Sequence, residues 1–164
     1  PRDGTCGDIG INTPDNGQYE RERDVDAICG VAMAIPAKTF FEMNGFDEAY
    51  PLYFEDTDFC ARLALRGLRR VYRPSAVLRH LHSATSVERS DFWTRSVTFS
   101  SILFRKRYQY PHEYEAWTRS LCHGTLRDRG VLDQLLAIDR VVAEPSRASR
   151  AISFKGQRLC RSES

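Results

Sequence analysis

Residues 55–67, Glu-Asp-Thr-Asp-Phe-Cys-Ala-Arg-Leu-Ala-Leu-Arg-Gly, restrict the fold of this chain more than any other part of its sequence. Three carboxylates fall in the first four positions, the apolar residues Phe59 and Leu63 are spaced i, i+4, and the stretch closes on Gly67. Acidic residues favour the first turn of a helix, and glycine favours the position just after its last turn. The stretch therefore predicts an amphipathic helix, and helix capping is one explanation of its acidic start.

The composition fits a single soluble globular domain, with 164 residues of which 41% are hydrophobic and 28% charged. No apolar run approaches the roughly 18 residues of a membrane-spanning helix. The five cysteines show neither a C-x-x-C nor a zinc-finger spacing, and their odd number favours a reducing compartment over a disulfide framework. We therefore expect a cytoplasmic protein, with contact to the inner face of the membrane as a further option.

Apolar runs and turn-forming residues divide the rest of the chain. After a connecting loop over residues 1–24, strands are predicted at residues 27–35, 68–72 and 75–81. Gly30 lies inside the first of these runs, where it allows a neighbour or a ligand to approach the backbone closely. Helices are predicted from Pro36 to Met43, ended by the turn Asn44-Gly45, and over residues 90–107, 114–122 and 131–142. The tail from residue 144 has few apolar anchors, and we expect it to be mobile.

The charges are unevenly distributed along the chain. Residues 1–60 carry 13 acidic and 4 basic side chains, whereas residues 61–164 carry 9 acidic and 20 basic ones. Such a division favours an acidic segment that holds a cation and a basic segment that faces phosphates, anionic lipid or another chain. An ordinary solvated surface explains the same counts.

The acidic cluster is the strongest candidate for chemistry. Glu55, Asp56 and Asp58 repel one another, so the cluster needs compensation from a helix N-terminus, from arginines or from a cation. A carboxylate close to like charges has a raised proton affinity, which suits a general base. The alternative interpretation is that these residues only cap the helix.

Two further groups have both a functional and a structural explanation. His80 and His82 lie on the same side of an extended chain and can ligate a metal, or they can be hydrogen-bonded residues at a strand end. Asp47 and Glu48 follow the turn at residues 44–45, and they can bind a polar ligand or tie down their own loop.

The order of these motifs resembles a known enzyme family. Gly30 in a strand is followed by Gly45-Phe46-Asp47-Glu48, by residues 53–62 (Tyr-Phe-Glu-Asp-Thr-Asp-Phe-Cys-Ala-Arg), by Gly67-Leu68-Arg69, and by Pro74-Ser75-Ala76-Val77 with His80. Over about residues 20–86 this series resembles the C-terminal half of family 2 glycosyltransferases, which are inverting enzymes of the GT-A fold. The resemblance is greatest to bacterial members that build polysaccharides and glycolipids, such as rhamnosyl- and mannosyltransferases.

The resemblance implies an α/β fold in which residues 25–86 form the C-terminal part of a GT-A catalytic domain. Residues 87–143 would be a helical extension and residues 144–164 a tail. The N-terminal half of the family, with its nucleotide-binding unit, does not appear in the sequence, so we expect this chain to be inactive without it.

The resemblance also implies roles for individual residues and for partners. The expected donor is a nucleotide-diphosphate sugar, the acceptor is a saccharide or a lipid-linked sugar, and no nucleic acid partner is implied. A divalent cation, Mg²⁺ or Mn²⁺, would neutralise the leaving diphosphate. The roles carried over are Asp56 as general base with Glu55 in support, Gly30, Asp47, Glu48 and Asp58 in substrate binding, and His80 at the metal.

Other interpretations of the same sequence stay open. Asp56-Thr57-Asp58 is literally an Asp-x-Asp motif, although the helix that ends at Gly67 favours the base interpretation. The carboxylates and histidines are also compatible with a metal-dependent hydrolase. The basic half of the chain is compatible with a non-catalytic module that binds anionic lipid or nucleic acid. Residues 89–107 could lay an amphipathic face on a membrane, or pack against another domain.

Overall fold

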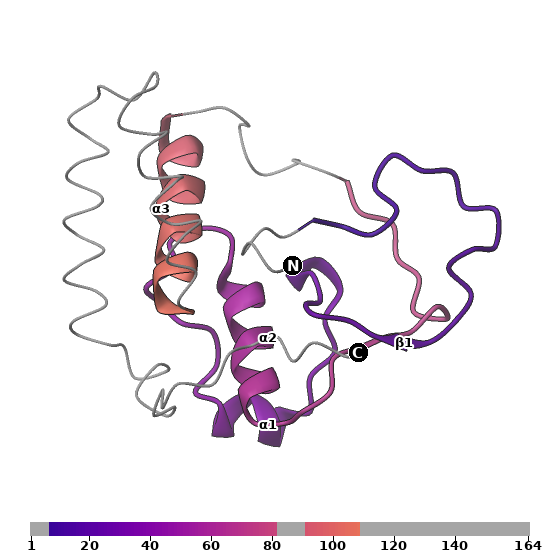
Figure 1. Ribbon diagram of the computed structural model, residues 1–164, viewed down its shortest axis with the longest axis horizontal. Helices are drawn as coiled ribbons and strands as arrows, with labels where there is room; N and C mark the ends of the chain where they lie inside the picture. The colour runs from indigo at the N-terminus through magenta and orange to yellow at the C-terminus, as the bar shows by residue number, and fades with distance from the viewer. Residues whose placement is uncertain (1–6, 82–90, 109–164) are drawn as a thin grey trace, which may run out of the picture.

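The computed structural model describes residues 7–81 and 91–108 (Figure 1). In chain order its elements are strand β1 (Arg23–Asp24), the 3₁₀ helix η1 (Gly30–Ala32), helices α1 (Ala37–Glu42) and α2 (Glu55–Leu65), strand β2 (Val71–Tyr72) and helix α3 (Asp91–Arg107). The two strands pair antiparallel. This mixture of helices with a small strand pair is consistent with the expected α/β class. None of the helices in the described ranges is both long and apolar enough to cross a bilayer.

Helix α2 is the centre of the described structure and is covered on two sides. On one side Phe59 and Leu63 pack with Met43 and with Phe40 of α1. On the other side Ala61 packs in a cluster that includes residues 102–104 of α3. Because both sides are covered, the six consecutive residues 58–63 are all buried. The predicted helix, its i, i+4 stripe and its end before Gly67, which has a φ of +70°, are confirmed.

Helix α1 ends in the turn that the sequence predicts. Asn44 and Gly45 both have positive φ, +57° and +65°, and the Gly45 amide donates to the carbonyl of Phe40 at 2.9 Å. Glycine takes this left-handed conformation without steric cost, and asparagine tolerates it better than most residues. The turn reverses the chain and sends residues 46–54 back toward α3.

Helix α3 lies beside α2 (Figure 1) and supplies half of the buried residues in the cluster that contains Ala61. Its existence over residues 91–107 confirms the predicted helix, but the buried face differs from the expected stripe. Leu103 and Ser96 are buried as expected, whereas Phe92 is 67% exposed and Ile102 is completely buried. The apolar spacing therefore identified the helix, while the neighbouring residues 49–54 and α2 determined which face became the core.

Arg62 of α2 is 1% exposed, and its guanidinium is bonded in three directions. Nε donates to Asp58 Oδ2 at 2.7 Å, Nη1 to the Met43 carbonyl at 2.6 Å and Nη2 to the Gly45 carbonyl at 2.7 Å. A buried charge is tolerated when it is paired and its remaining donors are satisfied. Arg62 therefore holds the turn after α1 against α2.

Two predicted strands are wrong. In the run 27–35 the backbone amide of Ile28 donates to Cys60 Sγ and that of Gly30 to Asp56 Oδ2, so side chains of α2 take the place of a neighbouring strand. The run forms η1 with flanking extended residues, and Val31 is 49% exposed. Residues 75–81 are not a strand either, and the strand predicted at 68–72 is reduced to β2. The helices predicted at 114–122 and 131–142, the tail and His82 lie outside the described residues.

Replacement of Arg62 tests the importance of its buried pair. In Arg62→Leu the Asp58 carboxylate loses its nearest cation and two carbonyls lose their donors, so we expect the free energy of unfolding to fall by about 3–5 kcal/mol. The matched control is Lys38→Ala, which removes an exposed i, i+4 pair with Glu42 at 3.8 Å and should cost less than about 0.5 kcal/mol. Urea unfolding of both variants measures the difference, and an Arg62→Leu loss below 1 kcal/mol would contradict the assignment.

Candidate functional site

The acidic start of α2 follows a turn with unusual backbone geometry. Tyr53 and Phe54 have φ values of +62° and +69°, a region that bulky residues rarely occupy. Helix α3 fixes this turn, because the Ser100 hydroxyl donates to the Leu52 carbonyl at 2.8 Å and the ring of Phe104 lies 5.6 Å from that of Phe54. Helix α3 thus sets the position at which α2 begins.

Asp56 lies in the first turn of α2 with its carboxylate half-buried and oriented by three donors. Oδ1 accepts the Thr57 amide at 2.6 Å and the Thr57 hydroxyl at 3.2 Å, and Oδ2 accepts the Gly30 amide at 2.7 Å. A carboxylate has about four acceptor positions, so these contacts leave one on Oδ2 for a further donor. The carboxylate thus binds an amide in the first turn of α2 and still has an acceptor position for a proton.

Gly30 approaches Asp56 closely, as its place in the sequence suggests. A Cβ atom at this position would lie 3.3 Å from Asp56 Oδ2 and 3.4 Å from Asp56 Cβ. A larger residue would therefore push the carboxylate away from the Gly30 amide. In this structure Gly30 orients Asp56, and its predicted contact with substrate stays a prediction.

Glu55 is the carboxyl group next to Asp56, and one of its oxygens, Oε2, is buried without a hydrogen-bond partner within the described part of the chain. Burial, together with the nearby Asp56 charge, raises the pKa of Glu55 above its ordinary value of 4.5, although a backbone hydrogen bond opposes this rise. Glu55 therefore retains its proton to higher pH than an exposed glutamate does.

The structure does not support direct substrate contact by Asp58 or Asp47, because each residue is 1% exposed. Asp58 Oδ1 accepts the hydroxyls of Tyr50 at 3.2 Å and Tyr108 at 2.8 Å, while Asp58 Oδ2 accepts from Arg62. Both residues belong to a buried ion network of two aspartates, two arginines and two tyrosines. Its members are Asp47, Tyr50, Asp58, Arg62, Arg107 and Tyr108.

Arg107 of α3 completes this buried ion network. Its Nη1 donates to Asp47 Oδ2 at 2.5 Å and lies 3.7 Å from Asp58 Oδ1, and its guanidinium lies over the Tyr50 ring at 5.2 Å. Burial alone lowers the pKa of Arg107, but Tyr50 and the two carboxylates more than offset this effect and raise it. Burial, followed by the Asp58 charge, raises the pKa values of Tyr50 and Tyr108 well above 10.0, so both phenols remain donors.

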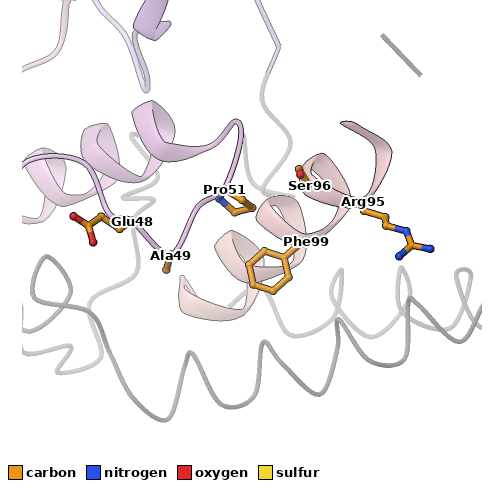
Figure 2. A pocket seen from close by; sticks show the side chains of 6 residues that line it. All are labelled: Glu48, Ala49, Pro51, Arg95, Ser96 and Phe99. Carbon is orange, nitrogen blue, oxygen red and sulfur yellow. The ribbon is translucent and has the colours of Figure 1, made fainter. Parts of the chain in front are cut away.

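Glu48, the other acidic residue of the Gly-Phe-Asp-Glu turn, is exposed. It borders a shallow hollow of about 360 Å³ between residues 48–51 and α3 (Figure 2). The hollow is lined by Glu48, Ala49, Pro51, Arg95, Ser96 and Phe99. In Figure 2 the Phe99 ring lies between Glu48 and Arg95, whose side chains extend away from each other. Glu48 is therefore accessible to a ligand, in contrast to Asp47.

His80 is exposed on the segment after β2. No group of three or more His, Cys, Asp or Glu side chains that could hold a metal ion is found within residues 7–81 and 91–108. The metal role of His80 stays a prediction.

The sequence analysis missed the arginines and tyrosines of the buried ion network. Asp58 and Arg62 are spaced i, i+4, so a salt bridge within α2 had a local signal. Arginines were named as one possible compensation for the acidic cluster, but Arg62 was not singled out. The pair between Asp47 and Arg107 had no such signal, because its partners are sixty residues apart in the chain.

Comparison with known proteins gives matches to glycosyltransferases. Residues 16–92 match a family described as the N-terminal domain of galactosyltransferase. The rhamnosyltransferase WbbL of Escherichia coli K12 is 39% identical over 88 residues, which are 51% of this chain and 32% of that protein. The N-acetylglucosaminyl-diphospho-decaprenol L-rhamnosyltransferase of Mycobacterium tuberculosis is 40% identical over 68 residues, which are 42% of this chain and 22% of that protein. No solved structure matches significantly.

This chain is thus similar to part of these glycosyltransferases, and the matched residues 16–92 include Gly30, the acidic start of α2 and His80. The chain spans a third or less of the length of these curated relatives. The resemblance to the C-terminal half of a GT-A enzyme stays a prediction.

The raised pKa of Glu55 leads to a prediction about pH. The folded protein binds the Glu55 proton more tightly than the unfolded chain, so this residue makes folding less favourable as the pH rises from 4.5 through its folded pKa. Glu55→Gln removes the ionisation and should therefore gain stability relative to wild type between pH 4 and pH 7.

Urea unfolding of wild type and variant at the two pH values measures this gain. The control is Glu20→Gln, at an exposed loop position. If the difference in unfolding free energy between Glu55→Gln and wild type is the same at pH 4 and pH 7, the raised pKa of Glu55 is contradicted.

Proposed function

We propose that this chain takes part in the transfer of a sugar from a nucleotide-diphosphate sugar to an acceptor hydroxyl, with inversion and with Asp56 as general base. The observation that carries the proposal is the Asp56 carboxylate, which is oriented by Gly30 and Thr57 and keeps one acceptor position on Oδ2. The family match and the two rhamnosyltransferase relatives support sugar transfer as the reaction class.

The proposed step needs a base on the acceptor side. As the acceptor oxygen bonds to the anomeric carbon, its proton passes to Asp56 Oδ2. The bond from that carbon to the diphosphate breaks, and its electron pair leaves with the nucleotide diphosphate. Attack from the face opposite the leaving group inverts the anomeric centre. General base catalysis of this kind contributes about 10²–10⁴-fold to the rate.

The neighbouring residues of the turn and helix support Asp56 in this proposal. Glu55 holds its proton to higher pH, which limits the negative charge beside the base. Glu48 is exposed at the edge of the hollow of Figure 2 and is the residue of its turn that we assign to substrate binding. Asp47 and Asp58 act as positioning residues through the buried ion network.

The relatives' names indicate the substrates to test first. We propose a deoxyhexose or hexose donor of the rhamnosyl or mannosyl type and an acceptor that is a saccharide or a lipid-linked sugar. A lipid-linked acceptor would place the protein at the cytoplasmic face of the membrane. The divalent cation expected from the resemblance stays a prediction, and no step above is routed through it.

The alternative of a basic binding module loses support from the structure. Six arginines of the basic half would form its binding surface: Arg62, Arg66, Arg69, Arg70, Arg73 and Arg79. Of these, Arg62 is buried in α2. Arg69 pairs with Asp24 at 2.9 Å and Arg73 with Glu22 at 3.1 Å. These charges are partly neutralised within the chain, which weakens an interaction with phosphates or anionic lipid.

Asp56→Asn tests the proposed base. The amide keeps an acceptor oxygen for Thr57 but cannot take a proton, so we expect kcat to fall by about 10²–10⁴-fold. Transfer from a nucleotide-diphosphate rhamnose to a polyprenyl-diphosphate-linked N-acetylglucosamine is measured in the full-length protein, with the melting temperature as the measure of folding.

The matched control is Asp24→Asn, which removes an exposed carboxylate outside α2 and should leave kcat unchanged. Turnover of Asp56→Asn within threefold of wild type would remove Asp56 from the proposed chemistry, whatever its stability. If activity falls only in proportion to the amount of folded protein, Asp56 stabilises the start of α2 and has no part in the chemistry.

A further inference from the structure

The strained turn before α2 separates two adjacent aromatic side chains. Left-handed backbone at a bulky residue costs about 1–3 kcal/mol, and it persists only where the surroundings enforce it. Here Phe54 is half-buried against Phe104 of α3, whereas Tyr53 is 42% exposed. The backbone conformation thus directs one ring into the core and the other outward, next to the start of α2.

Trp93 of α3 holds the exposed ring of Tyr53. The two rings meet edge to face, with centroids 6.2 Å apart and an interplanar angle of 81°, and the Trp93 indole N–H donates to the Tyr53 hydroxyl at 3.4 Å. This hydrogen bond joins the exposed Tyr53 to the partly buried Trp93, so it restricts the Tyr53 ring before any ligand arrives. An edge-to-face contact covers at most one face of the Tyr53 ring. The Tyr53 hydroxyl also keeps its own proton to donate.

We propose that Tyr53 and Trp93 form an aromatic subsite that holds the pyranose ring of the acceptor beside Asp56. This inference rests on the proposed function for the identity of the ligand as a sugar. A pyranose has an apolar C–H face, which packs on an aromatic ring, and a rim of hydroxyls, which can bond the phenol. Three residues span at most roughly 10–11 Å, so an acceptor saccharide can contact both Tyr53 and Asp56.

The position of the pair makes it an acceptor subsite rather than a donor subsite. Asp56 receives the acceptor proton in the proposed reaction, and Tyr53 lies in the turn that leads into the same helix. Binding energy at Tyr53 therefore orients the attacking hydroxyl and leaves the leaving group unaffected. Loss of the ring should raise the KM for the acceptor more than it changes kcat.

The first experiment compares Tyr53→Leu and Trp93→Leu with wild type in the transfer assay with the full-length protein. We expect the acceptor KM to rise about tenfold in each variant, by analogy with the loss of one aromatic stacking contact. The donor KM should stay within twofold of wild type. Tyr53→Phe, which keeps the ring and removes the hydroxyl, should show a smaller rise.

The matched control is Phe41→Leu, which removes a 74% exposed aromatic ring from α1 and should leave both KM values unchanged. An unchanged acceptor KM in Tyr53→Leu and Trp93→Leu overturns the proposal. An equal rise in donor and acceptor KM also overturns it, because the pair would then act only through the fold.

A second readout separates this inference from the proposed function. Trp93 and Trp117 are the only tryptophans among these 164 residues, so in the 164-residue chain Trp117→Phe makes indole fluorescence report on Trp93. Titration with an alkyl-diphosphate-linked N-acetylglucosamine, without donor, should change this fluorescence, and Tyr53→Leu should weaken the apparent affinity about tenfold. A response without any transfer activity keeps the subsite and rejects the enzymatic proposal. The absence of a response rejects the subsite even if transfer occurs.

Discussion

The buried pair of Asp58 and Arg62 holds together the parts of the molecule that form the candidate site. Two ionised groups at 1% exposure are costly to bury, and they persist because each is paired with the other and hydrogen-bonded to further groups. Asp58 receives bonds from two tyrosines in addition to Arg62, and Arg62 donates to two backbone carbonyls. The same pair therefore fixes α2 relative to the turn after α1 and to α3.

This arrangement explains how a strained and strongly acidic segment can be maintained. Helix α3 contributes Arg107 to the buried ion network at one end and Ser100 and Phe104 to the turn at residues 52–54. The network offsets the charge of two carboxylates, and the turn precedes the other two, Glu55 and Asp56, of which Asp56 meets Gly30. The stability of the buried part thus supports the half-buried start of α2, to which we assign the proposed chemistry.

The sequence predicted the elements whose signals are local. The helix at residues 55–65 followed from its i, i+4 spacing, its acidic first turn and Gly67, and the turn at 44–45 followed from Asn-Gly. The sequence could not predict that Asp56 and Asp58 have different burial and different hydrogen-bond partners, because both residues suit the start of a helix. Only packing shows that Asp58 meets Tyr50 and Tyr108, while Asp56 meets a backbone amide.

The errors have a related physical cause. A continuous apolar run such as residues 27–35 is compatible with a buried strand or with another covered segment, and periodicity does not separate these cases. Its amides are bonded by the side chains of Cys60 and Asp56, which lie about thirty residues away. Contacts over such separations carry no signal in a single sequence, and the same holds for the pair of Asp47 and Arg107.

A double-mutant cycle between Asp47 and Arg107 tests most directly whether one buried ion network joins the loop, α2 and α3. Unfolding free energies are measured for wild type, Asp47→Asn, Arg107→Met and the double variant. The account predicts that the double variant loses less than the sum of the single losses, with a coupling energy of about 1–3 kcal/mol. If the sum of the two single losses equals the loss in the double variant to within about 0.5 kcal/mol, the two residues act independently, and the account of one joint network is contradicted.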